Sequence, residues 1–206
     1  MKKIEYKKDY KQLYLPKITP SIIDVPKISY ITINGEGNPN SEVFAKNIEV
    51  LYALSYAVKM SYKRTDVSED YYEYTVFPLE GVWDLIDVTK PATDKDNLKY
   101  KLMIRQPDFL TTELYARFVS QVKNKKPQLE VEKVEFETIT EGLCCQMMHI
   151  GSYDDEPVSF ERMMKFCNDN GYKRILRIHR EIYISDPRKV EPSKRKTVLR
   201  FNIQKH

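Results

Sequence analysis

The chain has 206 residues and a formal net charge of +4, and Tyr, with 15 residues, is its commonest aromatic. Its six Gly form neither G-x-G-x-x-G nor G-x-x-x-x-G-K-[ST], which argues against a dinucleotide site or a P-loop. Three His and three Cys, without C-x-x-C or H-x-x-x-H spacing, lead us to expect no metal site and no cofactor.

The charge is concentrated at the two ends of the chain. Residues 1–17 and 188–206 are both rich in Lys and Arg, so the stretch between them is acidic overall. This distribution differs from the single basic face of a nucleic-acid-binding protein. No apolar run approaches the ~20 residues of a membrane helix, and the first residues lack the apolar core of a signal peptide. We therefore expect a cytoplasmic protein that binds neither nucleic acid nor membrane.

The first half of the chain is predicted to follow the order strand, helix, strand, strand. Residues 26–37 predict a strand that leads into a Gly-containing turn. Ser41 is a suitable N-cap for the helix that follows, in which apolar residues recur at helical spacing. Residues 71–83 predict a long aromatic strand, and residues 98–105 predict its partner.

The second half of the chain repeats this order. A connecting helix is predicted from about Thr112 to Lys126. Beyond it the sequence predicts a strand (residues 143–150), a helix (157–170) and two further strands (173–185 and 197–204).

The repeated order predicts an α+β fold made of tandem duplicated βαββ units. A single domain would then span residues 1–206, and the junction of its two units would form a shared central ligand pocket. Its predicted parts are an N-terminal extension (residues 1–20), a first βαββ unit (21–110), a connecting helix (111–127) and a second βαββ unit (128–206).

The long strand predicted before the last turn carries the most informative polar side chains. Glu181 shares one face of it with His179 and Tyr183. A mid-strand carboxylate among such neighbours is unfavourable unless it is solvated or paired. It could bind a cationic ligand or activate water. The alternative is a solvated Glu paired with Arg177 or Arg180.

Aromatic side chains are the second group of candidates. Trp83 is the only Trp and follows the proline-interrupted run F-P-L-E-G-V-W, so it could stack on a planar ligand or belong to the core. Tyr72 and Tyr74 could likewise offer ring faces to a ligand or pack internally. His149 lies at a strand-to-helix corner, too close in sequence to Ser152 for a Ser-His-Asp triad.

Several segments resemble the GyrI-like small-molecule-binding family. They are LYLPKITPSIIDVPKISYITINGEGNPN, TVFPLEGVWDL, MIRQPDFLTTE, HIGSYDDEP and HREIYISDPRKVEPSKRKTVLRF. The resemblance implies the fold of the effector-binding domain of multidrug-sensing regulators, in which two βαββ units surround a pocket. Because residues 1–20 are too few for a helix-turn-helix, we expect a stand-alone pocket without DNA-binding activity.

The resemblance also implies roles for individual residues. Glu181 occupies the position of the family's pocket acid, before the S-D-P turn. Trp83 matches the Trp that follows P-L-E-G, and Tyr100 stands where many relatives have a second Trp, in the strand that contains Met103. Some stand-alone members are hydrolases that open the ring of cyclopropanoid genotoxins inside an aromatic clamp.

Two hypotheses follow for the function. In the first, the protein hydrolyses cyclopropanoid or similar electrophilic planar toxins and so confers resistance. In the second, it binds and sequesters lipophilic aromatic or cationic compounds without catalysis. The first assigns catalysis to Glu181 and Tyr183, and both assign ligand binding to Trp83, Tyr72, Tyr74, Tyr100, Met103, His149 and His179.

Overall fold

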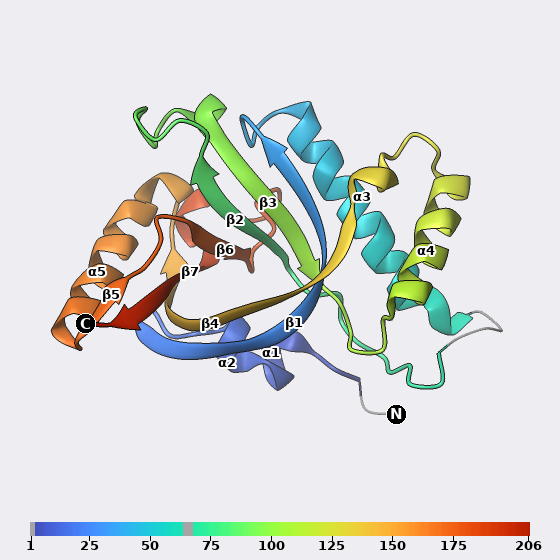
Figure 1. Ribbon diagram of the computed structural model, residues 1–206, viewed down its shortest axis with the longest axis horizontal. Coiled ribbons are helices and arrows are strands. Elements are labelled where there is room, and N and C mark those ends of the chain that lie inside the picture. Colours follow the sequence, from blue (N-terminus) through green and yellow to red (C-terminus); the bar gives the residue numbers. More distant parts are fainter. Residues whose placement is uncertain (1–2, 64–67) are drawn as a thin grey trace. The chain divides into compact units, whose positions relative to one another are not determined.

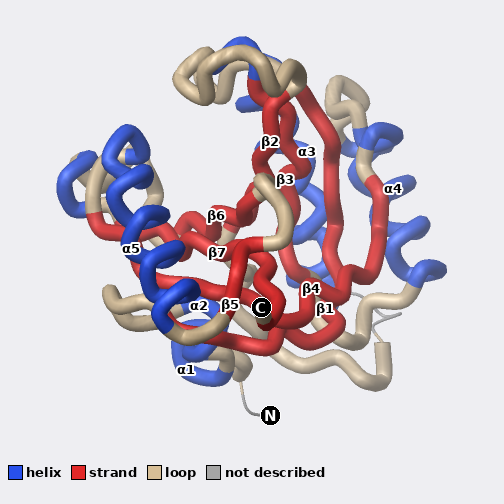
Figure 2. Tube along the Cα trace, turned by 60° about the vertical axis from the view of Figure 1, so that its left-hand side comes forward, coloured by secondary structure: helices blue, strands red, loops and turns tan. Residues whose placement is uncertain are grey.

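A computed structural model describes residues 3–63 and 68–206 of the chain, so the first two residues of the predicted N-terminal extension lie outside it. The contacts divide the chain into two compact units. Unit 1 comprises residues 1–5, 28–79 and 85–139, and unit 2 comprises residues 6–27, 80–84 and 140–206. Each unit combines antiparallel strands with helices (Figures 1 and 2), which confirms the α+β class.

Unit 1 is built on two paired strands and two long helices. Strand β1 (Ser21–Glu36), which enters unit 1 at Ile28, pairs with β3 (Leu98–Arg105) so that Tyr30 lies opposite Arg105. Helices α3 (Glu42–Lys59) and α4 (Thr112–Lys125) pack against each other (Figure 1), and α3 also packs on β3. Three short 3-10 helices complete the unit, η1 (Met60–Lys63), η2 (Lys95–Asn97) and η3 (Val131–Lys133).

The helix starts follow the sequence signals. The Ser41 hydroxyl accepts a hydrogen bond from the Phe44 backbone N–H at 3.2 Å, as the capping prediction requires. The Thr111 hydroxyl caps α4 in the same way through the Leu114 N–H at 3.2 Å. Each cap satisfies a backbone donor that the first turn of a helix would otherwise leave free.

The prediction of one strand over residues 71–83 is wrong, because strand β2 covers only Leu79–Leu85. It begins directly after Pro78, which has no N–H to donate to a sheet ladder. The preceding tyrosines belong to an aromatic cluster of unit 1, in which the Tyr74 ring lies 6.2 Å from Phe77 and 6.1 Å from Phe109.

Unit 2 is organised around strand β7 (Lys196–Lys205). It pairs antiparallel with β4 (Glu135–Ile150, in unit 2 from Thr140), β5 (Tyr172–Arg174) and β6 (His179–Tyr183), and β6 pairs in turn with β2. Helix α5 (Glu156–Asp169) lies beside β5 and β7 (Figure 2). The shorter helices are α1 (Tyr6–Asp9), α2 (Lys11–Tyr14), η4 (Tyr153–Asp155) and η5 (Pro192–Lys194).

The predicted strand over residues 173–185 is two strands, β5 and β6, so that prediction is wrong in its continuity. The Arg174 guanidinium donates hydrogen bonds to the carbonyls of Leu176 at 2.7 Å and Ile178 at 3.1 Å, inside the break. The same group lies 4.6 Å from the centre of the Phe201 ring. These contacts stabilise a bend that leaves Leu176 exposed.

A charged network is buried in unit 2. Arg180 forms ion pairs with Glu80 at 2.8 Å and Glu141 at 2.9 Å, and Arg200 reaches Glu141 at 3.2 Å. Burial opposes ionisation of Glu141, but the two guanidinium groups lower the pKa of its carboxyl below the usual value. Tyr14, on α2, donates to Glu80 at 3.3 Å, so the N-terminal extension contributes to this core.

Along the chain the elements follow the order β1, α3, β2, β3, α4, β4, α5, β5, β6, β7. The first series is strand–helix–strand–strand, whereas three strands follow α5, because the strand predicted over residues 173–185 is divided into β5 and β6. The duplication and its domain boundaries stay predictions. Among the described helices, none is both long and apolar enough to cross a membrane.

Candidate functional site

Strand β6 supplies three side chains of the site. His179, Glu181 and Tyr183 alternate with Arg180 and Ile182, which are 3% and 0% exposed on the opposite face. Because β6 is hydrogen-bonded to β2 on one side and to β7 on the other, its backbone is fixed along its length. The sequence prediction that the three polar residues share one face is therefore confirmed.

The carboxylate of Glu181 is held by neutral or weakly basic groups. Its Oε1 lies 3.0 Å from Nε2 of His179, and its Oε2 accepts a hydrogen bond from the Tyr183 hydroxyl at 2.8 Å. The indole N–H of Trp83 donates to that same hydroxyl at 2.9 Å. Trp83 therefore orients Tyr183, and Tyr183 orients Glu181.

The alternative pairing of Glu181 with an arginine is wrong. Arg177 forms its ion pair with Asp84 at 2.8 Å. Arg180 points to the opposite face of β6, where it pairs with Glu80 and Glu141. Neither guanidinium neutralises Glu181, so its charge stays available to a ligand.

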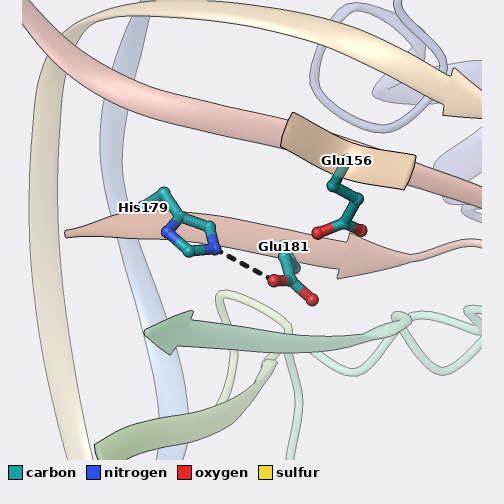
Figure 3. Close-up of side chains that lie close together, drawn as sticks. All are labelled: Glu156, His179 and Glu181. Atoms are coloured by element: carbon teal, nitrogen blue, oxygen red, sulfur yellow. Dashed lines mark hydrogen bonds and ion pairs between the residues drawn. The ribbon is translucent and has the colours of Figure 1, made fainter. Parts of the chain in front are cut away.

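Glu156 brings a second carboxyl group to Glu181. It is the first residue of α5 and is 5% exposed. Figure 3 shows its carboxylate pointing toward Glu181 on the neighbouring strand, beside the His179 ring. Single ligand atoms of Glu156, His179 and Glu181 all lie within 4.8 Å of one another. We call these three residues the carboxylate–histidine cluster.

Burial and charge repulsion raise the pKa values of two residues at this site, Glu156 and Tyr183. Burial, followed by the charge of Glu181, raises the pKa of Glu156 well above its usual value. Burial and the same charge raise the pKa of Tyr183, which keeps its hydroxyl protonated as a donor. The arrangement thus favours the protonated form of the Glu156 carboxyl.

Sequence reasoning missed Glu156, because an acidic residue at a helix start is explained well enough by the helix dipole. A signal for it was nevertheless present. Glu156, Ser159, Met163 and Cys167 are the buried residues of α5, and their spacing places them on one helical face. Continuing the apolar stripe back to the first turn would have placed Glu156 inside.

Aromatic rings contact His179 and Tyr183. The Tyr153 ring lies edge-on to Tyr183 at 6.0 Å, and the Phe160 ring lies edge-on to His179 at 4.8 Å. Trp83 is 6% exposed, so its indole is mostly internal. Neither Tyr153 nor Phe160 was predicted from the sequence as a site residue.

The Trp83–Tyr183 hydrogen bond depends on the absence of a side chain at Gly81. A Cβ at this position would lie 2.8 Å from Nε1 of Trp83 and 3.2 Å from the Tyr183 hydroxyl. We expect Gly81→Ala to displace these groups and lower stability by about 1–3 kcal/mol, as over-packing does. The emission spectrum of the single Trp and the urea unfolding curve measure both effects. An unchanged spectrum and midpoint would contradict this description.

His149 is close in sequence to Glu156, but its ring nitrogens form hydrogen bonds with residues outside the carboxylate–histidine cluster. Its Nδ1 lies 2.9 Å from the Ser159 hydroxyl, and its Nε2 lies 2.9 Å from the Ser152 carbonyl oxygen. With both ring nitrogens engaged, the ring ties β4 to the start of α5. Its proposed ligand contact stays a prediction.

The remaining candidates lie in unit 1. Tyr100 and Met103, on β3, are 4% and 0% exposed. Tyr74 is 1% exposed, and the Tyr72 hydroxyl accepts a hydrogen bond from the backbone N–H of Asp108 at 3.1 Å. The assignment of these four residues to the ligand site stays a prediction.

A small hollow of about 10 Å³ also lies in unit 1, lined by Phe109, Leu114, Phe118 and neighbouring residues. It borders none of the candidate site residues and carries no carboxylate. The candidate site is therefore defined by the grouping of its side chains and not by the volume of this hollow.

The chain is a small-molecule-binding domain of the α+β class. The sequence matches the GyrI-like small molecule binding domain over residues 18–204, and the chain belongs to this family. A comparison with curated proteins found no match.

Solved structures agree with this assignment. A hydrolase from Listeria innocua shares 34% identity and a TM-score of 0.92, with 98% of this chain and 100% of that chain covered. An uncharacterized conserved protein from Listeria innocua shares 35% identity at the same TM-score and coverage. The C-terminal domain of EcmrR, at 14% identity, a TM-score of 0.57 and coverage of 91% and 98%, shares the fold.

Proposed function

We propose that the protein is a hydrolase that opens the ring of cyclopropanoid or similar electrophilic planar toxins, with Glu181 as the general base. The observation that carries the proposal is the Glu181 carboxylate, oriented by Tyr183 and His179 and left without an arginine or lysine partner among the described residues. The similarity to a protein named as a hydrolase supports the same class of activity.

The proposed reaction adds one water across a strained carbon–carbon bond. Glu181 accepts a proton from water as the water oxygen bonds to the ring methylene. The broken bond leaves its electron pair on the conjugated system, whose carbonyl oxygen takes up a proton and becomes a hydroxyl. A positioned base of this kind contributes about 10²–10⁴-fold to the rate. Tyr183 keeps Glu181 oriented through its hydrogen bond to Oε2.

The substrate in this proposal is planar and largely apolar. The rings of Tyr153 and Phe160 contact Tyr183 and His179 and are proposed to stack on the substrate, with Trp83 supporting Tyr183 from within. By resemblance to the family, Tyr72, Tyr74, Tyr100 and Met103 are proposed as further contacts. The activity would detoxify such compounds in the cytoplasm and confer resistance to them.

Turnover can be tested on the unmodified protein. Incubation with a cyclopropanoid compound, followed by chromatography and mass spectrometry, should give a product that is heavier by one water, at a rate proportional to protein concentration. Intact compound after prolonged incubation would refute the proposed activity.

A second candidate function is binding without turnover. The two neighbouring carboxyl groups, with no Lys or Arg partner in the described part of the chain, favour a cationic ligand. Calorimetry with a panel of planar cations tests this function. It is favoured if the cations bind, if Glu181→Gln abolishes their binding and if no product forms.

A further inference from the structure

The carboxylate–histidine cluster also has the composition of a metal site. It combines one imidazole nitrogen with one oxygen from each of two carboxylates, all within 4.8 Å of one another. In Figure 3 the His179 ring and the Glu156 carboxylate converge on Glu181 from two different elements, β6 and α5. The sequence predicted no metal site, because it contains no ligand spacing of the usual kind.

A second observation points to a missing ligand. Glu156 is 5% exposed, and its Oε1 has no hydrogen-bond partner among the described residues. A buried carboxylate oxygen without a partner is costly, since desolvation is not compensated. Within the same described part of the chain, no Lys or Arg forms an ion pair with Glu156 or Glu181. The cluster therefore brings two carboxyl groups together without a Lys or Arg, and a bound cation could replace the proton that Glu156 retains.

We propose that Glu156, His179 and Glu181 bind a divalent first-row transition metal ion of the Zn²⁺ type. Nε2 of His179 and Oε1 of Glu181 are 3.0 Å apart. Adjacent ligands bonded at about 2.1 Å to one tetrahedral ion are separated by about 3.4 Å, so this pair would have to open by only a few tenths of an ångström. A small rotation of the Glu156 carboxyl would bring the third oxygen to the same ion. The imidazole favours Zn²⁺ over Mg²⁺ or Ca²⁺, which prefer oxygen ligands alone.

The surroundings of the cluster resemble the outer shell of a metal site. Tyr183 donates a hydrogen bond to Oε2 of Glu181 at 2.8 Å, and Trp83 orients Tyr183. The Phe160 ring packs edge-on against His179 and limits its rotation. Such outer contacts orient the ligands and typically change metal affinity by about 10–100-fold when they are removed.

This inference goes beyond the proposed hydrolysis and does not depend on it. A bound ion would occupy the Glu181 oxygen that is proposed to accept the proton of water. Metal binding and the base role are therefore mutually exclusive on one molecule, and Zn²⁺ should inhibit turnover where turnover exists. Metal binding itself can be measured without any substrate.

The test is a titration of the full chain with Zn²⁺ by calorimetry and with Co²⁺ by visible absorption. We expect one ion per chain, and Co²⁺ bands typical of low-coordinate nitrogen and oxygen ligation. Glu156→Gln and His179→Gln should each weaken binding at least tenfold, and Tyr183→Phe should weaken it less. Glu161→Gln, an exposed residue on the same helix, and His206→Gln, an exposed histidine, are the matched controls and should bind as the unmodified chain does.

Circular dichroism of each variant establishes that it is folded before titration. If Glu156→Gln does not fold, His179→Gln carries the test, because His179 is a partly exposed strand residue. Absence of binding by the unmodified chain would overturn the proposal. Binding that is unaltered in the folded cluster variants, or lost in His206→Gln, would overturn it equally.

Discussion

Glu181→Gln is expected to lower the rate of cyclopropanoid hydrolysis by about 10²–10⁴-fold, the contribution of a positioned general base. The amide has nearly the shape of the carboxylate, and its oxygen can still accept the hydrogen bond that Tyr183 now gives to Oε2. It cannot accept a proton from water at neutral pH. The single-turnover rate constant, measured at saturating protein, isolates the chemical step from binding.

Two controls make this result specific. Glu161→Gln makes the same chemical change on the exposed face of α5 and should leave the rate unchanged. Calorimetry with a neutral planar ligand should show that Glu181→Gln still binds, because the surrounding rings are intact. If the variant hydrolyses the substrate at the full rate, Glu181 has no catalytic role.

Glu141→Gln is expected to lower the free energy of unfolding by about 3–5 kcal/mol, the typical cost of removing one partner from a buried ion pair. Its carboxylate pairs with both Arg180 and Arg200, and the side chains of these arginines are 3% and 2% exposed. Only Glu80 would remain to balance the two buried guanidinium groups, and burial raises the pKa of its carboxyl, which disfavours its charged form. Urea unfolding, followed by far-UV circular dichroism, measures the change.

Glu161→Gln again provides the comparison, because this residue is exposed and should change the unfolding midpoint little. An unchanged midpoint for Glu141→Gln would mean that the buried network contributes nothing to stability. The same variant also tests whether the buried network positions the candidate site, because Arg180 belongs to the strand that carries Glu181. A rearranged β6 would alter the fluorescence emission of Trp83, which lies opposite His179 on the neighbouring strand.

The elements that the sequence predicted well are those that depend on local signals. Ser41 caps its helix through its own hydroxyl, and the strand over residues 98–105 has the predicted bounds. Strand lengths were predicted less well, because they depend on contacts made elsewhere. Pro78 could have been used to shorten the aromatic strand, but the bend after Arg174 depends on the packing of its guanidinium against Phe201.

The candidate site likewise combines features that follow from local sequence patterns with features that depend on distant contacts. The face shared by His179, Glu181 and Tyr183 follows from the two-residue period of a strand and was predictable. The hydrogen bond between Trp83 and Tyr183 joins residues 100 positions apart and follows only from the pairing of β2 with β6. The approach of Glu156 depends in turn on how α5 packs in unit 2, which no local pattern specifies.

The central claim is that Glu181 activates water to open a strained ring. Its most direct test is a single turnover of a cyclopropanoid substrate in ¹⁸O-labelled water, analysed by mass spectrometry. We predict a ring-opened product that carries one ¹⁸O at the former ring methylene, formed rapidly by the unmodified protein and at least about 10²-fold more slowly by Glu181→Gln. Substrate recovered intact, or labelled product formed equally fast by both proteins, would contradict the claim.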